Sequence, residues 1–213
     1  MRKADGMEKL TGVRKSAYRL TEPAVQLLMR TGITPNNLSW LGLSIAVGAA
    51  VLIATGHLFI AGFVVIAAGF FDMLDGSLAR RTNRVTASGA VLDSTLDRVS
   101  EAVLLLGVMI FYLFLGSRPA LGILFVCLAL IGSPLTSYIR AKAEAIGIDC
   151  KMGLFTRPER VIVLAVGLLA SPLNNNALII ALAVIATLSF VTAGQRLSYL
   201  LKQTGNQCGG RVG

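Results

Sequence analysis

Four aspartates at helical spacing are the residues of this chain most suited to chemistry. They lie in the stretch DMLDGSLARRTNRVTASGAVLDSTLD, at Asp72, Asp75, Asp93 and Asp97. Because residues three or four apart share one face of a helix, each pair should project from one side of its helix. Two such faces opposed would form a four-carboxylate cage. Hard oxygen ligands of this kind suit Mg²⁺ or a similar divalent ion.

Ion pairing is the structural alternative for these aspartates. Four arginines lie close in the sequence: Arg80, Arg81, Arg84 and Arg98. Arginines could neutralise two of the carboxylates, but the regular spacing favours a metal site. Gly76 and Gly89 lack a side chain that would crowd the carboxylates, so a bulky ligand could approach the backbone closely. Arg80, one turn beyond Gly76, can offer a planar fork of donors to a phosphate at the metal site.

The elements that position these residues are predicted to be membrane helices. The 213 residues are 54% hydrophobic and 15% charged, and the mean hydropathy is +0.72, outside the range of an ordinary soluble domain. Apolar stretches near the roughly 20-residue length of a bilayer-spanning helix recur along the chain. We expect six of them, at about residues 37–56, 57–79, 88–116, 119–143, 158–173 and 175–200. The short connectors predict an all-α, polytopic bundle with no internal repeat, and so one membrane domain over residues 1–202.

The segments outside the predicted spans are polar or mixed in composition. Residues 1–32 form a juxtamembrane segment in which Arg and Lys alternate loosely with Leu, Val and Met. This pattern indicates either an amphipathic helix lying in the membrane interface or a plain basic anchor. Residues 203–213 are polar and glycine-rich, and we expect a disordered tail.

Basic residues predict the orientation of the chain. Of the 20 Lys and Arg, the connectors after the first, third and fifth predicted spans contain only Arg118. Because cytoplasmic loops carry the excess of Lys and Arg, both termini and the carboxylate site should face the cytoplasm, in a multi-pass protein of the cell (plasma) membrane. The formal net charge of +9 then indicates an anionic membrane surface and not a nucleic acid as the partner.

The whole carboxylate stretch follows the pattern D-x2-D-G-x2-A-R-x8-G-x3-D-x3-D, with every position filled from Asp72 to Asp97. This pattern resembles the signature of the CDP-alcohol phosphotransferase family. The resemblance implies a membrane enzyme that displaces CMP from a CDP-linked lipid by the attack of an alcohol. It also implies two Mg²⁺ ions, for which Mn²⁺ can substitute. One would be held by Asp72, Asp75 and Asp93 and the other by Asp72, Asp93 and Asp97, with Asp97 as the general base.

The same resemblance assigns a CDP-lipid pocket. The segment GITPNNLSW is similar to the family's stretch beside the cytidine site. The residues it implies are Ile33, Thr34, Pro35 and Asn36, completed by Gly76, Arg80 and Thr86. The segment TPNN also reads as a helix start with Asn36 or Asn37 as N-cap, and both interpretations can hold together.

Basic residues between Arg140 and Arg196 are the candidates for an acceptor site. They are Arg140, Lys142, Lys151, Arg157, Arg160 and Arg196. An acceptor with its own phosphate would need such a cluster, but positive-inside anchoring explains the same residues, and TRPER is also a capping box from Thr156 to Glu159.

The segments SYIRAKAE, RPER and GQRL resemble the phosphatidylinositol-phosphate synthase and archaetidylinositol-phosphate synthase branch of the family. The resemblance implies inositol 1-phosphate as acceptor, with its phosphate held at Arg140, Arg160 and Arg196. The chain departs from that branch by carrying Arg at 140 and Lys at 142, the reverse order, and the two side chains are not interchangeable at a bidentate site.

Three alternatives stay open on the sequence alone. A phosphatidylglycerophosphate synthase would take glycerol 3-phosphate at the same basic cluster. A membrane prenyltransferase binds a lipid pyrophosphate through aspartates and Mg²⁺, but lacks the D-G-x2-A-R continuation. A cation transporter would explain the carboxylates but not the glycines and the arginine between them. The family resemblance further implies a homodimer embedded in membrane lipids.

Overall fold

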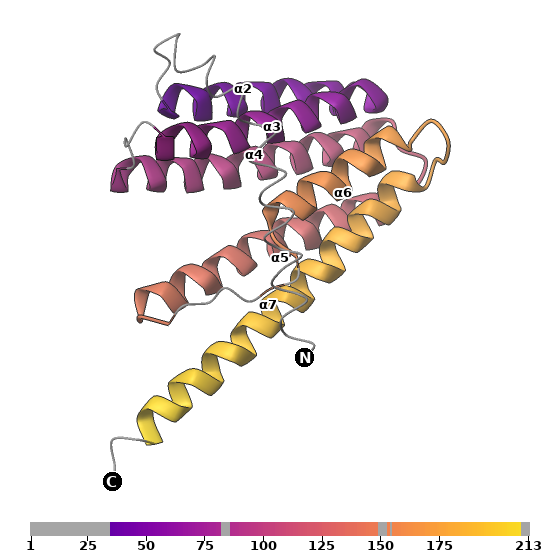
Figure 1. Cartoon of the computed structure of the whole chain (residues 1–213). Helices are drawn as coiled ribbons and strands as arrows, with labels where there is room; N and C mark the ends of the chain where they lie inside the picture. Colours follow the sequence, from indigo (N-terminus) through magenta and orange to yellow (C-terminus); the bar gives the residue numbers. More distant parts are fainter. Residues whose placement is uncertain (1–34, 82–85, 149–152, 154, 210–213) are drawn as a thin grey trace, which may run out of the picture. The chain divides into compact units, whose positions relative to one another are not determined.

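The computed structural model describes residues 35–81, 86–148, 153 and 155–209, and the side chains of 35, 75–77, 79–81 and 205–209 lie outside that description. Helices are the only regular elements in this part of the chain (Figure 1). They are α2 (Pro35–Ala54), α3 (Leu58–Arg81), α4 (Ala87–Phe114), α5 (Pro119–Ala145), α6 (Arg157–Leu169) and α7 (Ala177–Gly209). The all-α prediction is confirmed, and each predicted span coincides with one helix.

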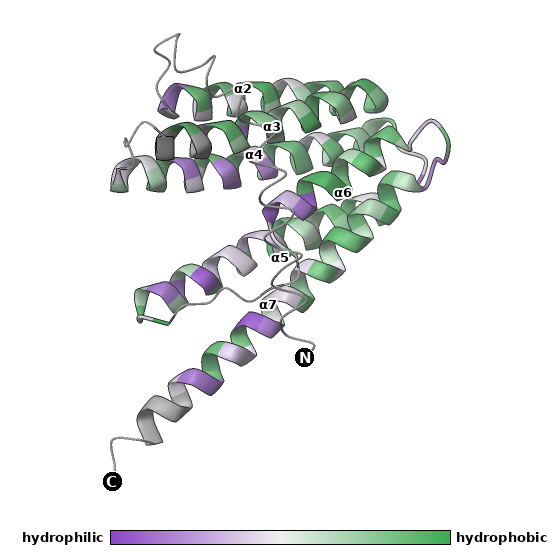
Figure 2. Cartoon of the chain, viewed as in Figure 1, coloured by the Kyte–Doolittle hydropathy of each residue, from purple (hydrophilic) through white to green (hydrophobic). Residues whose placement is uncertain are grey.

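Three of the described helices are long and apolar enough to cross a membrane: Asn36–Ala54, Pro119–Ala145 and Ala177–Thr204. A shorter apolar helix covers Leu58–Leu74. In Figure 2 the hydrophilic residues of α4 lie in its first half and hydrophobic residues fill its second half. The chain is therefore a membrane protein, and the count of six spans stays a prediction.

Both ends of the helical region differ from the sequence prediction. α2 begins at Pro35, so Asn36 and Asn37 lie in its first turn and are not N-caps; proline suits the first helical position because it has no N–H to leave unsatisfied. α7 continues to Gly209, so the expected disordered tail is wrong for residues 203–209. Thr204 Oγ1 donates to the carbonyls of Leu200 and Leu201, and one isolated glycine does not end a helix. The predicted interfacial helix of residues 1–32 lies outside the described residues.

The chain divides into two compact units, where the sequence predicted one bundle. One unit comprises residues 1–45 and 67–100, and the other comprises 46–66 and 101–213. The long helices α2, α3 and α4 each contribute one end to each unit. The division therefore follows the middle of these helices and not a connector, which is why no composition shift in the sequence marks it.

A small leucine cluster holds the first unit together. Leu38 of α2 packs with Leu74 and Leu78 of α3, all three nearly inaccessible to solvent, and Phe71 covers them. Among membrane helices, close packing of such side chains stabilises through van der Waals contact. Leu74 and Leu78 are four residues apart and so share one face of α3, and this fixes the rotation of the helix that carries Asp72.

The second unit is built on α7. This helix packs along α5 and against α6, and Figure 1 shows α5 and α7 side by side where they cross. Small residues let its helices approach closely: a Cβ on Gly107 of α4 would lie 2.6 Å from the carbonyl oxygen of Ala50 in α2. Such close backbone contacts are typical of helices packed within a bilayer.

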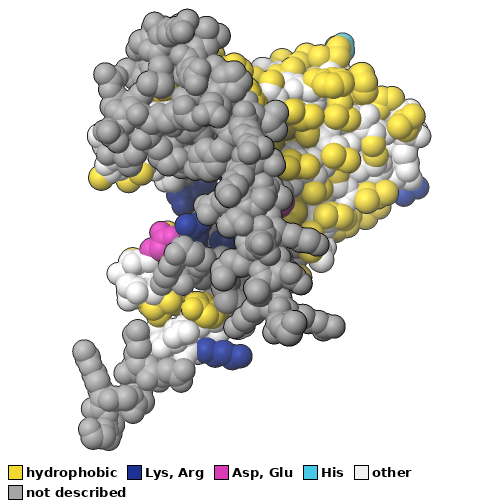
Figure 3. Space-filling view, viewed as in Figure 1, with side chains coloured by type: hydrophobic (Ala, Val, Ile, Leu, Met, Phe, Trp, Pro, Cys, Tyr) yellow, Lys and Arg dark blue, Asp and Glu magenta, His cyan; other side chains and the backbone are white. Residues whose placement is uncertain are grey.

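Large hydrophobic side chains face outward along the helices, among them Val51, Phe63 and Ile131, with exposed fractions of 58%, 56% and 60%. Hydrophobic side chains cover a broad part of the described surface visible in Figure 3. A soluble domain rarely exposes so much contiguous apolar surface, whereas lipid tails solvate it without cost.

Candidate active site

Three of the four predicted aspartates converge in the first unit. One carboxylate oxygen from each of Asp72, Asp93 and Asp97 can be chosen so that all lie within 4.8 Å of one another, and all three residues are half-buried. Asp72 comes from α3, and the other two come from adjacent turns of α4. The geometry fits a divalent cation, because three hard oxygen donors meet at a point that one ion can bridge.

The fourth aspartate, Asp75, lies on α3 three residues after Asp72, and its side chain is outside the described residues. The same holds for Gly76 and Arg80 of that helix. Their predicted roles in metal and CDP-lipid binding stay predictions.

Part of the predicted nucleotide pocket surrounds the first turn of α4. Thr86 precedes this helix, and its Oγ1 accepts the N–H of Gly89 at 3.0 Å, which satisfies a donor of the helix N-terminus. A Cβ on Gly89 would lie 2.9 Å from Thr86 Oγ1 and 3.5 Å from Asn36 Oδ1. Asn36 and Thr86 are thus brought together over Gly89, and the predicted approach of a ligand to the backbone there stays a prediction. Ile33, Thr34 and the side chain of Pro35 lie outside the described residues.

Arg160, predicted to bind the acceptor phosphate, forms a two-point salt bridge with Glu101 in the second unit. Its Nε donates to Glu101 Oε1 at 2.6 Å and its Nη2 to Oε2 at 2.9 Å. Arg160 Nη1 also donates to Thr136 Oγ1 at 3.3 Å. The side chains are only 4% and 13% exposed. The pair therefore joins α4 to α6 in a fixed geometry, since a bidentate bond restrains both orientation and distance.

Arg196 of α7 meets the same threonine. Its Nη1 donates to the carbonyl oxygen of Thr136 at 2.7 Å, and the residue is 5% exposed. Gly153 covers the guanidinium: a Cβ there would lie 2.8 Å from both Nε and Nη2 of Arg196, and the glycine has φ +137°. Arg160 and Arg196 are thus brought together at Thr136 from two different helices, and they place two buried guanidinium groups beside one another.

The remaining predicted acceptor residues lie at element ends. Arg140, near the end of α5, pairs with Glu144 one turn further on at 2.8 Å, and both side chains are 53% exposed. Lys142 is exposed. Arg157 begins α6 beside the predicted capping box of Thr156 and Glu159, which is confirmed. Thr156 N–H donates to Glu159 Oε2 at 2.8 Å.

Three residues of this arrangement escaped the sequence prediction: Glu101, Thr136 and Gly153. Glu101 did carry a signal, because it extends the spacing of Asp93 and Asp97 by one more helical turn. Thr136 and Gly153 carry none, since their roles depend on side chains about 60 and 40 residues away in sequence that only the fold brings near.

Comparison with known proteins agrees with this geometry. The family described as CDP-alcohol phosphatidyltransferase matches residues 32–192, more than half of the chain. A phosphatidylinositol phosphate synthase of Mycobacteroides abscessus is 37% identical over 193 residues, which are 86% of this chain and 84% of that protein. An archaetidylinositol phosphate synthase of Methanothermobacter thermautotrophicus is 36% identical over 172 residues, 80% of this chain and 85% of that protein.

Solved structures show the same fold. The crystal structure of Mycobacterium tuberculosis phosphatidylinositol phosphate synthase with CDP-DAG bound has a TM-score of 0.78 and 35% identity, over 85% of this chain and 94% of that one. A second structure of that synthase, in complex with manganese and citrate, has a TM-score of 0.78 and 34% identity, over 85% and 88% of the two chains. The aspartate pattern, the matched family and these relatives lead to one conclusion: the chain belongs to the CDP-alcohol phosphatidyltransferase family of membrane enzymes.

Proposed function

We propose that this enzyme transfers the phosphatidyl group of a CDP-linked lipid to a hydroxyl of inositol 1-phosphate and releases CMP. The observation that carries the proposal is the convergence of Asp72, Asp93 and Asp97 at ligand distance within the family's signature. The relatives named phosphatidylinositol phosphate synthase and archaetidylinositol phosphate synthase support the acceptor.

The donor set fits two Mg²⁺ ions, or Mn²⁺ in their place. Asp72, Asp93 and Asp97 would hold them together with Asp75. Shared carboxylates at this spacing are typical of sites that hold two ions. Bound there, the ions would supply electrostatic stabilisation of the diphosphate and of the departing phosphate.

Asp97 is the general base in the proposed reaction. It accepts the proton of the acceptor hydroxyl as that oxygen forms a bond to the lipid-side phosphorus. The bond from this phosphorus to the bridging oxygen of CMP breaks, and CMP leaves with the electron pair. A carboxylate is a weak base, but positioned against the hydroxyl it contributes about 10²–10⁴-fold. Asn36, Thr86 and Gly89 border the nucleotide, with Ile33, Thr34, Pro35, Gly76 and Arg80 completing its pocket.

Arg160 and Arg196 bind the phosphate of the acceptor, helped by Arg140, Lys142 and Arg157. The two buried guanidinium groups at Thr136 support this role, because the planar fork of a guanidinium matches phosphate oxygens. Glu101 fixes Arg160 in its orientation and so acts as a positioning residue. Preorganised donors of this kind lose little entropy when the ligand binds.

Both termini of the enzyme lie in the cytoplasm, and the chain spans the plasma membrane six times. Two copies of the enzyme form a homodimer. The nearly uncharged connectors 55–57 and 170–176 support this orientation. Labelling of single cysteines at each end of the bundle in sealed cells would test the topology, and crosslinking within native membranes would test the dimer.

An acceptor panel tests the reaction. The purified protein is given CDP-diacylglycerol, Mg²⁺ and one of inositol 1-phosphate, glycerol 3-phosphate, inositol or serine, and CMP release is measured. We expect turnover with inositol 1-phosphate to exceed that with each of the others at equal concentration. Faster CMP release with glycerol 3-phosphate would identify that compound, and not inositol 1-phosphate, as the acceptor. No CMP release with any alcohol would overturn the transferase assignment for this chain.

A further inference from the structure

A second candidate site lies in the second unit, in a cavity of about 650 Å³. The connectors after α2, α4 and α6 border it, together with the adjoining ends of α3, α4 and α7. The volume lies within the range of about 300–1,000 Å³ that is usual for small-molecule sites. None of the residues of the proposed reaction lines this cavity, so its role is separate from the transfer.

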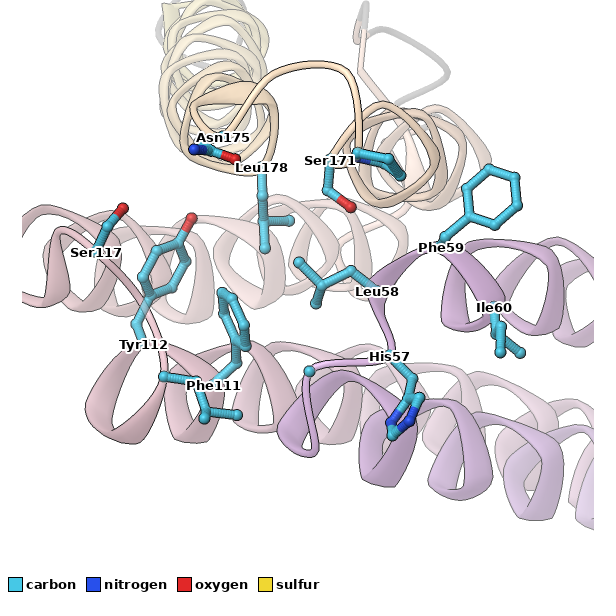
Figure 4. Close-up of a pocket in the computed structure, with 13 residues that line it drawn as sticks. His57, Leu58, Phe59, Ile60, Phe111, Tyr112, Ser117, Ser171, Asn175 and Leu178 are labelled. Carbon is cyan, nitrogen blue, oxygen red and sulfur yellow. The ribbon is translucent and has the colours of Figure 1, made fainter.

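Tyr112 is the central polar group of the cavity. The residue is 3% exposed, and Figure 4 shows its hydroxyl directed toward Asn175, between Ser117 and Leu178. Among the described residues no hydrogen-bond partner for this hydroxyl is found. The ring is packed, but the hydroxyl oxygen is accessible from the cavity, so a ligand there can accept its proton.

Two glycines hold the Tyr112 ring in place. A Cβ on Gly122 would lie 2.3 Å from the ring carbon Cγ, and one on Gly116 would lie 2.5 Å from Cδ1. Phe111 packs edge-on against the ring at a centroid distance of 5.2 Å. The ring therefore fits a slot that any other residue at 116 or 122 would close. This packing restrains the Tyr112 ring so that its hydroxyl is directed into the cavity.

Apart from His57, the other polar groups that line the cavity carry no charge. Ser171 donates its own hydroxyl to the carbonyl of Leu168 at 2.7 Å, so its oxygen is left to accept, whereas the Asn175 amide and the Ser117 hydroxyl can donate. No Asp, Glu, Lys or Arg is among the lining residues described. A cationic headgroup would find no carboxylate partner there. Phe111, Leu58 and Leu178 supply apolar walls (Figure 4).

The lining combines hydrogen-bonding groups, His57 among them, with aromatic and aliphatic walls, at helix ends where the chain leaves the bilayer. Aromatic residues with one polar tip concentrate at this depth. We propose that the cavity binds the glycerol-ester region of one membrane lipid from the leaflet at this end of the bundle, with an ester carbonyl accepting from Tyr112. In the topology proposed above this is the outer leaflet.

The test uses a single tryptophan as reporter. The chain has one tryptophan, Trp40, so the Trp40→Phe variant provides a silent background into which Phe111→Trp is introduced. The full-length protein is delipidated in detergent and titrated with phosphatidylcholine brominated on its acyl chains near the ester, and bromine quenching is followed. Phe114→Trp, 79% exposed and three residues further along, is the matched control for bulk lipid contact.

We expect quenching at position 111 to saturate at a low lipid-to-protein ratio, and quenching at 114 to rise in proportion to the lipid fraction of the micelle. Adding Tyr112→Phe should shift the midpoint at 111 to roughly fivefold higher lipid, the loss of one hydrogen bond. Asn175→Ala, at an exposed position, is a second variant that should shift it in the same direction.

Three results would overturn the proposal. Quenching at 111 could track the lipid fraction as at 114. It could also saturate with a midpoint that neither variant moves. Finally, acrylamide could quench position 111 while the brominated lipid does not, which would identify a water-filled vestibule.

Discussion

The buried salt bridge between Glu101 and Arg160 offers the sharpest test of the structure, because the chain contains a matched exposed bridge. Arg160 Nε lies 2.6 Å from Glu101 Oε1, with side chains 4% and 13% exposed. Arg140 Nε lies 2.8 Å from Glu144 Oε1, with both side chains 53% exposed. The substitutions Glu101→Gln and Glu144→Gln remove the same charge and keep the same shape, so the difference between them measures burial.

Loss of one partner from a buried pair costs about 3–5 kcal/mol, because the other charge stays desolvated. An exposed pair four residues apart on a helix contributes only about 0.3–0.5 kcal/mol. At about 2–4 °C per kcal/mol for a chain of this size, Glu101→Gln should lower Tm by roughly 6–20 °C. Glu144→Gln should lower it by no more than about 2 °C by the same conversion.

Thermal unfolding of the purified protein in one detergent, followed by circular dichroism, measures both shifts. The double variant Glu101→Gln, Arg160→Gln is expected to be more stable than Glu101→Gln alone, because it removes the charge that the single substitution leaves uncompensated. Equal Tm losses for the two single variants would refute the reasoning, and so would losses that simply add in the double variant.

The remaining predictions concern the proposed reaction. Asp97→Asn should lower the rate of CMP release by about 10²–10⁴-fold while CDP-lipid binding persists, and near-wild-type release would remove Asp97 as the base. Arg196→Gln should raise the KM for the phosphorylated acceptor by about 10–100-fold, the loss of a charge-assisted hydrogen bond, with a much smaller change for the CDP-lipid; an unchanged acceptor KM would contradict the pocket. Gly153→Ala should destabilise the fold by about 1–3 kcal/mol and raise the acceptor KM, since its Cβ would meet the Arg196 guanidinium; wild-type Tm and KM would show that the contact is not tight. Chelation of divalent ions with EDTA should stop CMP release, and Mg²⁺ or Mn²⁺ should restore it; release that survives chelation would exclude a metal role for the aspartates.

The sequence predicted what depends on local periodicity. The six helices follow from apolar length and from turn residues, and their starts differ from the expected ones by no more than two residues. The convergence of Asp72 with Asp93 and Asp97 follows from spacing that gives each helix one carboxylate face. The division into two units was not predicted, because it falls within three helices and no connector or composition shift marks it.

Roles that depend on distant contacts were harder to predict. The sequence singled out Arg160 as a candidate for binding the acceptor phosphate, but nothing near it in sequence shows that Glu101, 59 residues away, is its partner. Arg140 has its partner four residues away and could have been paired by inspection. Only the fold can exclude water from both side chains of an ion pair, so the partners of a buried pair tend to be far apart in sequence. Breaking a buried pair costs more stability than breaking an exposed one, yet its partners are harder to identify from the sequence.

Three carboxylates on one helix have different roles because of what faces them. Asp93, Asp97 and Glu101 follow one another at four-residue intervals along α4. The first two meet another carboxylate, Asp72, and two ionised groups 4.8 Å apart repel by roughly 3 kcal/mol at an effective dielectric constant of about 20. A divalent cation at the proposed site would relieve that repulsion. Glu101 meets a guanidinium instead and needs no ion. Residue type and spacing therefore define where a charge is placed, and the sign of the facing charge separates the proposed metal ligands from the carboxylate of the salt bridge.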